Sequence, residues 1–478
     1  MHKVQSAISG VFWKTLEQYG VMGIQFILQI ILARILDPEV YGIIAIALVF
    51  TALSNVFIQA GFSTALIQKK IIDDKDTSSV LYFSLGIAAV LYTVLFFTSP
   101  VIANYFNMPD LRSLIRVMAI CFFPGAICSI QNSLLSRFIN FKAVFIASIS
   151  AVFLSGSIGI ALAYLGFGVW ALAFQQLLYH FSLMFAQYFQ IRWKPLFSFE
   201  CSRLKSFLSF GWKVLATNLV NEFFVEIRSI AIGRYYSGAD LSFFNRGKQF
   251  PFLFMKSING SLQAVLLPKM VQFQDEKVAQ HSIMHRTISV SSYVMFPILT
   301  ILALSASDMV SWMLTDKWLP CVVYIQLHCL YFATWPIETT NLQALYAVGR
   351  SDTVLKMESI RKAIDFILLV LTLKYGVVAI AIGSVVAGIV SVPFYIIPSD
   401  RIVGYKIRWQ LRDMASPIIL TLIMAVIVWY IGSINLPHFV SFCLQWVIGI
   451  LVYISLSILI CNSQLNYIKD IIVSLIRK

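Results

Sequence analysis

Long apolar runs separated by short polar stretches dominate the sequence. An α-helix needs about 20 mostly apolar residues to cross a bilayer, and no run shows the alternating pattern of an outer-membrane barrel strand. We therefore predict an all-α polytopic membrane protein with about 14 transmembrane helices. The predicted spans are residues 14–34, 40–62, 79–104, 114–136, 143–165, 168–191, 209–232, 248–271, 287–306, 320–347, 358–375, 377–397, 416–433 and 438–461.

Composition supports this class. Of 478 residues, 59% are hydrophobic and 12% are charged, whereas a soluble domain has about 25% charged residues. A soluble enzyme, a disordered protein and a secreted disulfide scaffold are excluded. The seven cysteines are scattered without metal-binding spacing, so we interpret them as small core residues.

The chain carries a net charge of +14, with its cations spread thinly between the apolar runs. Membrane lipids are therefore the expected partner, and nucleic acid is not. With the N-terminus inside, about 25 Lys and Arg residues, among them Arg361, fall on the cytoplasmic side and about eight outside. This bias predicts that both termini are cytoplasmic.

Three short matches, in the same order, indicate an internal duplication. Residues 12–14 and 33–34 (FWK, AR) correspond to residues 211–213 and 233–234 (GWK, GR). Gln131 follows Pro124 by seven residues, as Gln343 follows Pro336, and residues 168–173 resemble residues 376–381. Chance matching among apolar helices is the alternative explanation. The two glutamines fit either broken helices that face a cavity or simple helix packing.

The duplication predicts two parallel six-helix lobes, because six spans per repeat is an even number. We expect an N-terminal lobe over residues 1–195 and a cytoplasmic linker over 196–208. A second lobe over 209–398 and a cytoplasmic loop with an extra helix pair over 399–478 follow.

Polar residues inside predicted spans are costly and therefore informative. The first helix of each half carries a polar stripe, and we expect both stripes to line one water-filled cavity. In the first span the stripe contains Lys14, Glu17, Gln18, Gln25 and Gln29, and in the seventh span it contains Asn218, Glu222 and Glu226. Gln25, Gln29 and Asn218 are thus candidate substrate-binding residues.

Four carboxylates are candidates for coupling transport to an ion, H⁺ or Na⁺: Glu17, Glu222, Glu226 and Glu338. Glu222 and Glu226 repel each other at i, i+4 spacing, which suits proton or sodium binding. A structural ion pair with Arg228 or Lys213 is the alternative, and Glu17 can pair locally with Lys14. Asp308, Glu338 and Asp365 are interpreted as isolated acids, of which Glu338, after Pro336, is the first to test.

Cations concentrate around the seventh and eighth spans, where guanidinium and ammonium groups could bind a diphosphate. Snorkelling toward the membrane interface is the alternative. The candidates are Arg228, Arg234, Arg246, Lys248 and Lys256. The sequence contains no catalytic motif and no loop long enough for a catalytic domain, so we predict a carrier without a cofactor or metal, not an enzyme.

Five short motifs occur in order along the chain: residues 33–42 (ARILDPEVYG), 61–68 (GFSTALIQ), 166–172 (GFGVWAL), 193–195 (WKP) and 349–352 (GRSD). These motifs resemble the polysaccharide transport branch of the multidrug/oligosaccharidyl-lipid/polysaccharide flippase superfamily, near the colanic acid, teichuronic acid and lipopolysaccharide O-unit exporters. The second repeat departs from the first, since residues 233–238 (GRYYSG) lack the Pro38-Glu39 pair.

The resemblance implies a flippase of the bacterial inner membrane that works by alternating access. Its substrate would be an undecaprenyl-diphosphate-linked oligosaccharide for surface polysaccharide, that is lipopolysaccharide, capsule or exopolysaccharide. A polysaccharide polymerase and a chain-length regulator are further candidate partners. The alternative is a cation-coupled drug antiporter of the same superfamily, which would need a cavity richer in acids than in cations.

Overall fold

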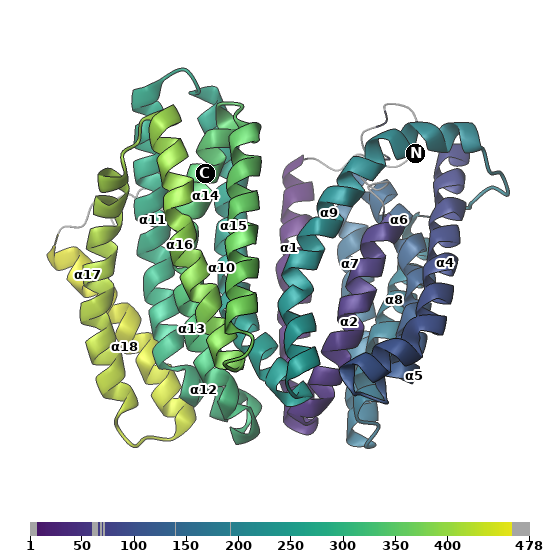
Figure 1. Ribbon diagram of the computed structural model, residues 1–478, viewed down its shortest axis with the longest axis horizontal. Coiled ribbons are helices and arrows are strands. Elements are labelled where there is room, and N and C mark those ends of the chain that lie inside the picture. Colours follow the sequence, from purple (N-terminus) through teal and green to yellow (C-terminus); the bar gives the residue numbers. More distant parts are fainter. Residues whose placement is uncertain are drawn as a thin grey trace. The chain divides into compact units, whose positions relative to one another are not determined.

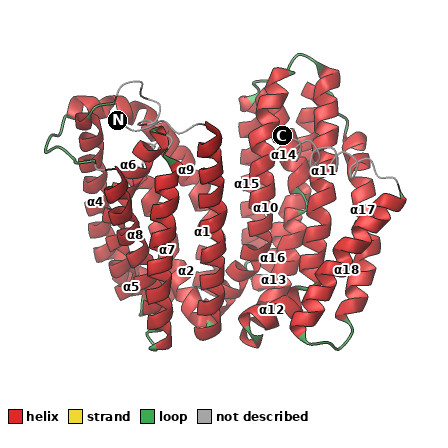
Figure 2. Ribbon diagram, turned by 180° about the vertical axis from the view of Figure 1, so that it is seen from behind, coloured by secondary structure: helices red, strands yellow, loops and turns green. Residues whose placement is uncertain are grey.

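The computed structural model describes residues 7–59, 66, 69, 72–138, 140–191 and 193–460. Regular structure in these residues is helical throughout, without strands (Figures 1 and 2). The helices are α1 (Ala7–Ile35), α2 (Pro38–Gln59), α4 (Asp74–Phe106), α5 (Leu111–Met118), η1 (Ala119–Cys121), α6 (Phe122–Arg137), α7 (Phe141–Tyr164), α8 (Val169–Ile191), α9 (Cys201–Tyr235), α10 (Gly238–Gln272), α11 (Lys277–Leu304), α12 (Ala306–Leu314), η2 (Asp316–Cys321), α13 (Val322–Phe332), α14 (Trp335–Ala347), α15 (Ser351–Thr372), α16 (Val377–Val403), α17 (Ile407–Gly432) and α18 (His438–Leu459).

Ten helical segments of the described chain are long and apolar enough to cross a membrane. They are Phe12–Ile35, Pro38–Gln59, Asp74–Phe106, Leu111–Arg137, Phe141–Tyr164, Val169–Ile191, Lys277–Leu304, Val377–Val403, Ile407–Gly432 and His438–Leu459. The other four predicted spans fall on α9, α10, α13 with α14, and α15, which are more polar or broken. The prediction of a multi-pass helical membrane protein is confirmed.

The order of elements occurs twice along the chain. A two-residue turn joins α1 to α2 and, 200 residues later, α9 to α10. In each half a short helix and a break precede the proline that the sequence singled out: α5 and η1 precede Pro124 of α6, and α13 and a turn at residues 333–334 precede Pro336 of α14. The apolar run 320–347 is therefore not one straight helix, because the chain turns between α13 and α14. This repetition has the form expected of a duplication.

Contacts divide the chain into two compact units, unit 1 (Met1–Ser242) and unit 2 (Phe243–Lys478). In unit 1, α7 packs against α1 and α8, and α9 packs against α2 and α4. The boundary between the two units, after Ser242, therefore differs from the linker predicted at 196–208, because α9 packs against helices of the first repeat. In unit 2, α11 packs against α17, α15 against α16, and α18 against α17 and α12.

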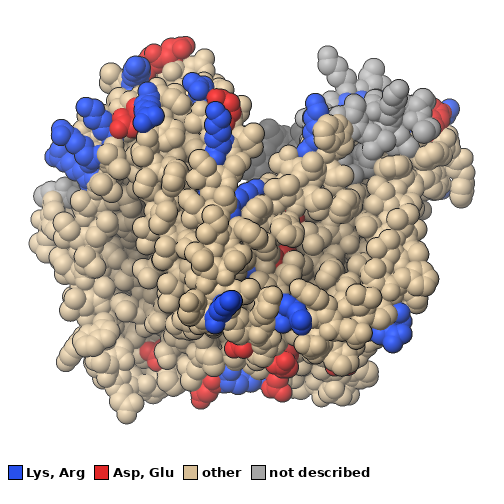
Figure 3. Space-filling model, in the orientation of Figure 1, with Lys and Arg blue, Asp and Glu red and all other residues tan. Residues whose placement is uncertain are grey.

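Side-chain caps fix several helix ends. Asp73 and Asp76 form a capping box at the start of α4, and the Asn140 side chain accepts a hydrogen bond from the backbone N–H of Ala143 at the start of α7. On the face in Figure 3, charged side chains gather mainly at the two ends of each unit. Large apolar side chains such as Phe97, Phe153 and Trp429 are exposed along the helices. This distribution suits helices surrounded by lipid.

Some sequence features lie outside the described residues. They are the end of the predicted span 40–62, the motif 61–68 except Leu66, the last residue of the span 438–461, and the chain beyond residue 460.

Candidate functional site

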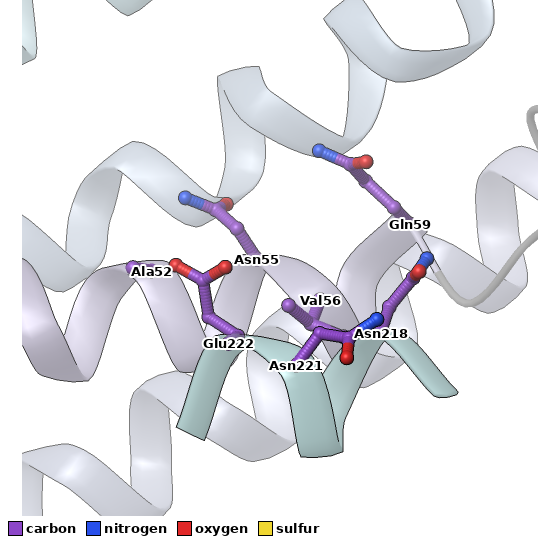
Figure 4. A pocket seen from close by; sticks show the side chains of 7 residues that line it. All are labelled: Ala52, Asn55, Val56, Gln59, Asn218, Asn221 and Glu222. Carbon is purple, nitrogen blue, oxygen red and sulfur yellow. The ribbon is translucent and has the colours of Figure 1, made fainter. Parts of the chain in front are cut away.

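A polar pocket of about 390 Å³ lies between α2 and α9 in unit 1 (Figure 4). Four amides and one carboxylate form most of its wall. Its lining consists of Ala52, Asn55, Val56 and Gln59 from α2 and Asn218, Asn221 and Glu222 from α9. Asn218 and Glu222 share one face of α9 because they stand four residues apart. The polar stripe predicted on the seventh span therefore faces a pocket.

A second pocket of about 210 Å³ adjoins the first, since Ala52 and Asn55 line both. Glu226, one turn after Glu222, lines this second pocket. Its remaining walls come from α2, α5, η1 and α8, at Leu48, Thr51, Met118, Cys121, Gln176 and His180. Together the two pockets offer amide donors and acceptors, two carboxylates and one imidazole, which can hydrogen-bond a hydroxyl-rich ligand.

Asn55, Gln59, Gln176 and His180 are pocket residues that the sequence analysis missed. Asn55 and Gln59 stand in the predicted span 40–62, and Gln176 and His180 in the span 168–191. The signal that singled out Asn218, a polar side chain inside an apolar span, applies to them equally. Their placement shows that α2 and α8 contribute to the polar surface together with α9.

On α1, the predicted residues have different surroundings. Glu17 forms an ion pair with Lys14 over 2.7 Å, so the local pairing considered above does occur. Gln25 is exposed and Gln29 is half-buried. Neither glutamine belongs to the lining of the two pockets between α2 and α9.

Several of the predicted cations contact aromatic or polar groups within their own unit. Arg234 donates a 2.7 Å hydrogen bond to the backbone oxygen of Tyr105 and stacks over its ring. Arg246 is buried, donates a 2.8 Å hydrogen bond to Gln249 and lies over the Trp318 ring.

The remaining three cations are Arg228 and Lys248, both half-buried, and Lys256, which is exposed with its ammonium over the Phe252 ring. None of the five cations belongs to the described lining of the two pockets in unit 1. Their predicted diphosphate contacts remain a prediction.

The interpretation of Glu338 and Asp308 as isolated acids is wrong. Glu338 forms a 2.9 Å ion pair with Arg361, a residue that the charge count had assigned to the cytoplasmic surface. Asp308 accepts hydrogen bonds from Ser441 at 2.5 Å and Gln445 at 3.2 Å, and lies 2.8 Å from His438 Nδ1. Sequence reasoning missed these partners because they come from other helices.

Gln131 and Gln343 are both buried in packed helices. The Gln131 amide donates a 3.4 Å hydrogen bond to the backbone oxygen of Met184 in α8, which fits the helix-packing explanation. In the motif at 349–352, Gly349 has a φ of +74°, and Arg350 donates two hydrogen bonds to Asp352. Those bonds hold the pKa of the exposed Asp352 carboxyl below its ordinary value.

Comparison with known proteins places this chain in a family. The profile described as polysaccharide biosynthesis protein matches residues 31–323, which is more than half of the chain. The chain belongs to this polysaccharide biosynthesis protein family. The resemblance inferred from the motifs is therefore confirmed.

Relatives in the polysaccharide biosynthesis family match nearly the whole chain. The lipopolysaccharide biosynthesis protein WzxC of Escherichia coli K12 is 21% identical over 90% of this chain and 88% of its own length. The teichuronic acid biosynthesis protein TuaB of Bacillus subtilis is 24% identical over 90% of each chain. A structure of the lipid II flippase MurJ in an inward closed conformation shares the fold. Its TM-score is 0.76 at 17% identity, over 93% of this chain and 98% of that one.

Proposed function

We propose that this member of the polysaccharide biosynthesis family is a flippase for an undecaprenyl-diphosphate-linked oligosaccharide. The observation that carries the proposal is the pair of adjoining polar pockets between α2, α8 and α9 in a bundle of membrane helices. The larger pocket, at about 390 Å³, lies within the usual size range of small-molecule sites. Amide and carboxylate groups suit sugar hydroxyls, because amides both donate and accept hydrogen bonds and carboxylates accept them.

The lipid tail of the substrate would stay in the bilayer while the sugars pass along the polar face of α9. Asn55, Asn218 and Glu222 would contact the sugar part, with Gln25 and Gln29 of α1 as further contacts. The diphosphate would bind cations on α9 and α10, of which Arg228 and Lys256 are the first candidates. Arg228 follows Glu226 by two residues on α9 and is half-buried.

The same proposal includes the membrane arrangement. All fourteen predicted spans would cross the bacterial inner membrane, in two six-helix lobes and an extra helix pair, α17 and α18. Both termini would be cytoplasmic. Transport would proceed by alternating access without a cofactor, and a polysaccharide polymerase and chain-length regulator would act on the exported product.

One observation favours a second candidate, a cation-coupled drug antiporter. Glu222 and Glu226 line the pockets of unit 1, and the described lining of those pockets contains no Lys or Arg. An acidic pocket of this kind suits an organic cation. The family match favours the flippase, because the relatives named above take part in polysaccharide synthesis.

The deciding experiment deletes the gene in its host and analyses lipid-linked sugars in spheroplast membranes. The flippase predicts an undecaprenyl-diphosphate oligosaccharide accumulating on the cytoplasmic face, with its polymer missing outside. The wild-type gene should restore the polymer. Normal polymer without an accumulated intermediate contradicts the flippase, and increased drug sensitivity of the same strain would then identify the antiporter.

A further inference from the structure

Unit 2 contains a buried charged cluster that the proposed sugar pathway does not use. Glu338 of α14 is 4% exposed, and its two carboxylate oxygens accept different donors. Arg361 of α15 lies 2.9 Å from Oε2, and the Thr334 hydroxyl donates a 2.5 Å hydrogen bond to Oε1. A guanidinium can only donate, so the contact between Arg361 and Glu338 belongs to the ionised carboxylate.

Arg361 connects Glu338 to a second carboxylate. Its guanidinium donates to the hydroxyl of Tyr331 at 2.9 Å and to the hydroxyl of Tyr395 at 3.2 Å. The Tyr395 hydroxyl donates in turn to Glu358 Oε1 at 2.7 Å. Glu358 and Arg361 stand three residues apart on α15, so their side chains are neighbours on one helix face. Arg361 can therefore exchange one carboxylate for the other without moving its helix.

These residues surround a pocket of about 190 Å³ inside unit 2. Glu338, Glu358, Arg361 and Tyr395 line it together with Asn259 and Gln263 of α10. Gln263 is exposed and Glu358 is half-buried, so the pocket extends from the protein interior toward the surface. Polar side chains therefore line this pocket together with Glu338.

The charges of this cluster do not balance. Glu338, Glu358 and Arg361 together carry a net charge of −1, and the Asp365 carboxylate on α15 also acts on Glu338. Burying negative charge in excess of positive charge is unfavourable in a region of low dielectric, and uptake of one proton reduces that excess. Of these acids, Glu338 is the most deeply buried, so neutralising it relieves the largest cost of desolvation.

The repeated fold does not need an ion pair at this position. In the first repeat, Ala126 stands two residues after Pro124, where Glu338 follows Pro336. Ala126 is fully buried. The same helical packing is therefore made with a small apolar residue in one half and with a charged one in the other. This difference favours a function of the pair beyond stabilising the fold.

The titratable groups near Glu338 come from several helices. Glu358, Arg361 and Asp365 belong to α15. The hydroxyls of Tyr331 on α13 and Tyr395 on α16 contact Arg361. On α11, His281 bonds to the backbone oxygen of Val403 and His285 to Asp413. On α10, the ammonium of Lys256 lies over Phe252. The acting groups are Arg361, Glu358, Asp365, Tyr331 and Tyr395.

We propose that Glu338 is the proton-binding site that couples transport, and that Arg361 is its charge switch. A proton from water adds to the Glu338 carboxylate, which becomes a neutral acid and loses its ion pair. Arg361 then pairs with Glu358, so one guanidinium balances one carboxylate while Glu338 is neutral. Release of the proton to the other side restores the Glu338–Arg361 pair. This inference rests on the proposed transport function, and it selects Glu338 over the pocket-lining Glu222 and Glu226 as the coupling acid.

The first test uses the purified full-length protein and needs no substrate. Infrared difference spectra between neutral and acidic buffer should show a carboxylic acid C=O band from Glu338. Glu338→Gln should remove this band, and Asp352→Asn, which breaks an exposed ion pair at the start of the same helix, should leave it. A band that survives in Glu338→Gln overturns the site, whatever the protein transports.

The second test measures coupling in the complemented deletion strain, as polymer output with and without a protonophore. Glu338→Gln and Arg361→Gln should lose the response to the protonophore, and Asp352→Asn should keep it. The double variant Glu338→Gln/Arg361→Gln removes both members of the buried ion pair and keeps only the half-buried Glu358 carboxylate, so its protein level should recover while the response stays lost. If the double variant recovers both its protein level and its response to the protonophore, the pair is merely structural and the proposal is overturned. Normal polymer in the uncomplemented strain would instead contradict the proposed flippase function. In that case the infrared experiment alone decides whether Glu338 binds a proton.

Discussion

The Glu39 side chain accepts a 2.8 Å hydrogen bond from the backbone N–H of Ala239, 200 residues later in the chain. Both residues belong to unit 1 and lie in the first turns of α2 and α10. Glu39 thereby caps a helix N-terminus, where the unpaired N–H groups and the helix dipole favour a carboxylate. The carboxylate of the first repeat therefore binds a backbone N–H at the corresponding turn of the second repeat.

Removing this cap should destabilise unit 1 modestly. Glu39→Ala should lower the free energy of unfolding by about 1 kcal/mol, the usual cost of losing a capping side chain. Thermal unfolding of the detergent-purified protein measures the loss. Glu39→Gln keeps an acceptor oxygen and should lose less. Equal unfolding temperatures for Glu39→Ala and the wild type would show that the cap contributes nothing.

Gly42 should tolerate no side chain. A Cβ atom at Gly42 would lie 1.9 Å from the backbone oxygen of Gly238, and a backbone atom cannot move aside as a flexible side chain can. Gly42→Ala should therefore cost about 1–3 kcal/mol or prevent accumulation of the protein. Gly23→Ala is the matched control, because nothing lies within 4 Å of its Cβ position and alanine favours the helix. Membrane protein levels and thermal unfolding compare the two, and a stable Gly42→Ala protein would contradict this packing.

Asn55 should matter for transport more than for stability, because it lines both pockets of unit 1. Asn55→Leu removes an amide from the sugar pathway and should reduce surface polymer severalfold at an unchanged protein level. Thr93→Val is the control, since Thr93 is a polar residue of α4 that bonds its own helix at the oxygen of Ala89. Equal polymer output from both variants would exclude this pocket from the pathway.

The cations of α9 and α10 should bind the diphosphate. Arg228→Ala and Lys256→Ala should each abolish surface polymer while the protein level holds, because each removes a charge-assisted bond to phosphate. Lipid-linked oligosaccharide should accumulate in the same cells. Arg112→Ala, a change at an exposed cation of α5, should leave the polymer unchanged. Normal surface polymer in the Arg228→Ala and Lys256→Ala variants would show that neither cation is needed to bind the diphosphate.

Asp308 should anchor the C-terminal helix pair. It accepts hydrogen bonds from Ser441 and Gln445 of α18, so Asp308→Asn weakens two charge-assisted bonds at once. We expect a loss of about 1–3 kcal/mol in the free energy of unfolding. Asp110→Asn is the control, because that side chain makes no capping hydrogen bond at the start of α5. Thermal unfolding that is equal in both variants would contradict the anchor.

The sequence by itself determined the class of the protein and the faces of its helices. Apolar runs of bilayer length predict membrane helices because backbone polar groups must be satisfied within the segment. The spacing of Asn218, Glu222 and Glu226 places them on one side of α9, since side chains four residues apart share a helix face. The duplicated motifs at residues 33–34 and 233–234 mark two equivalent turns, the one between α1 and α2 and the one between α9 and α10, because each motif is local in the sequence.

Only the tertiary structure decided which of these faces meet. The charge pattern assigned Arg361 to the cytoplasmic side. In the structure, α15 packs beside α14, and the Arg361 guanidinium forms an ion pair with Glu338. Glu39 and Ala239 became partners only because α2 and α10 begin side by side. Periodicity fixes the direction of a side chain around its own helix, but the neighbouring helix is chosen by the packing of the whole unit. Partners that lie far apart along the chain are therefore absent from any local pattern.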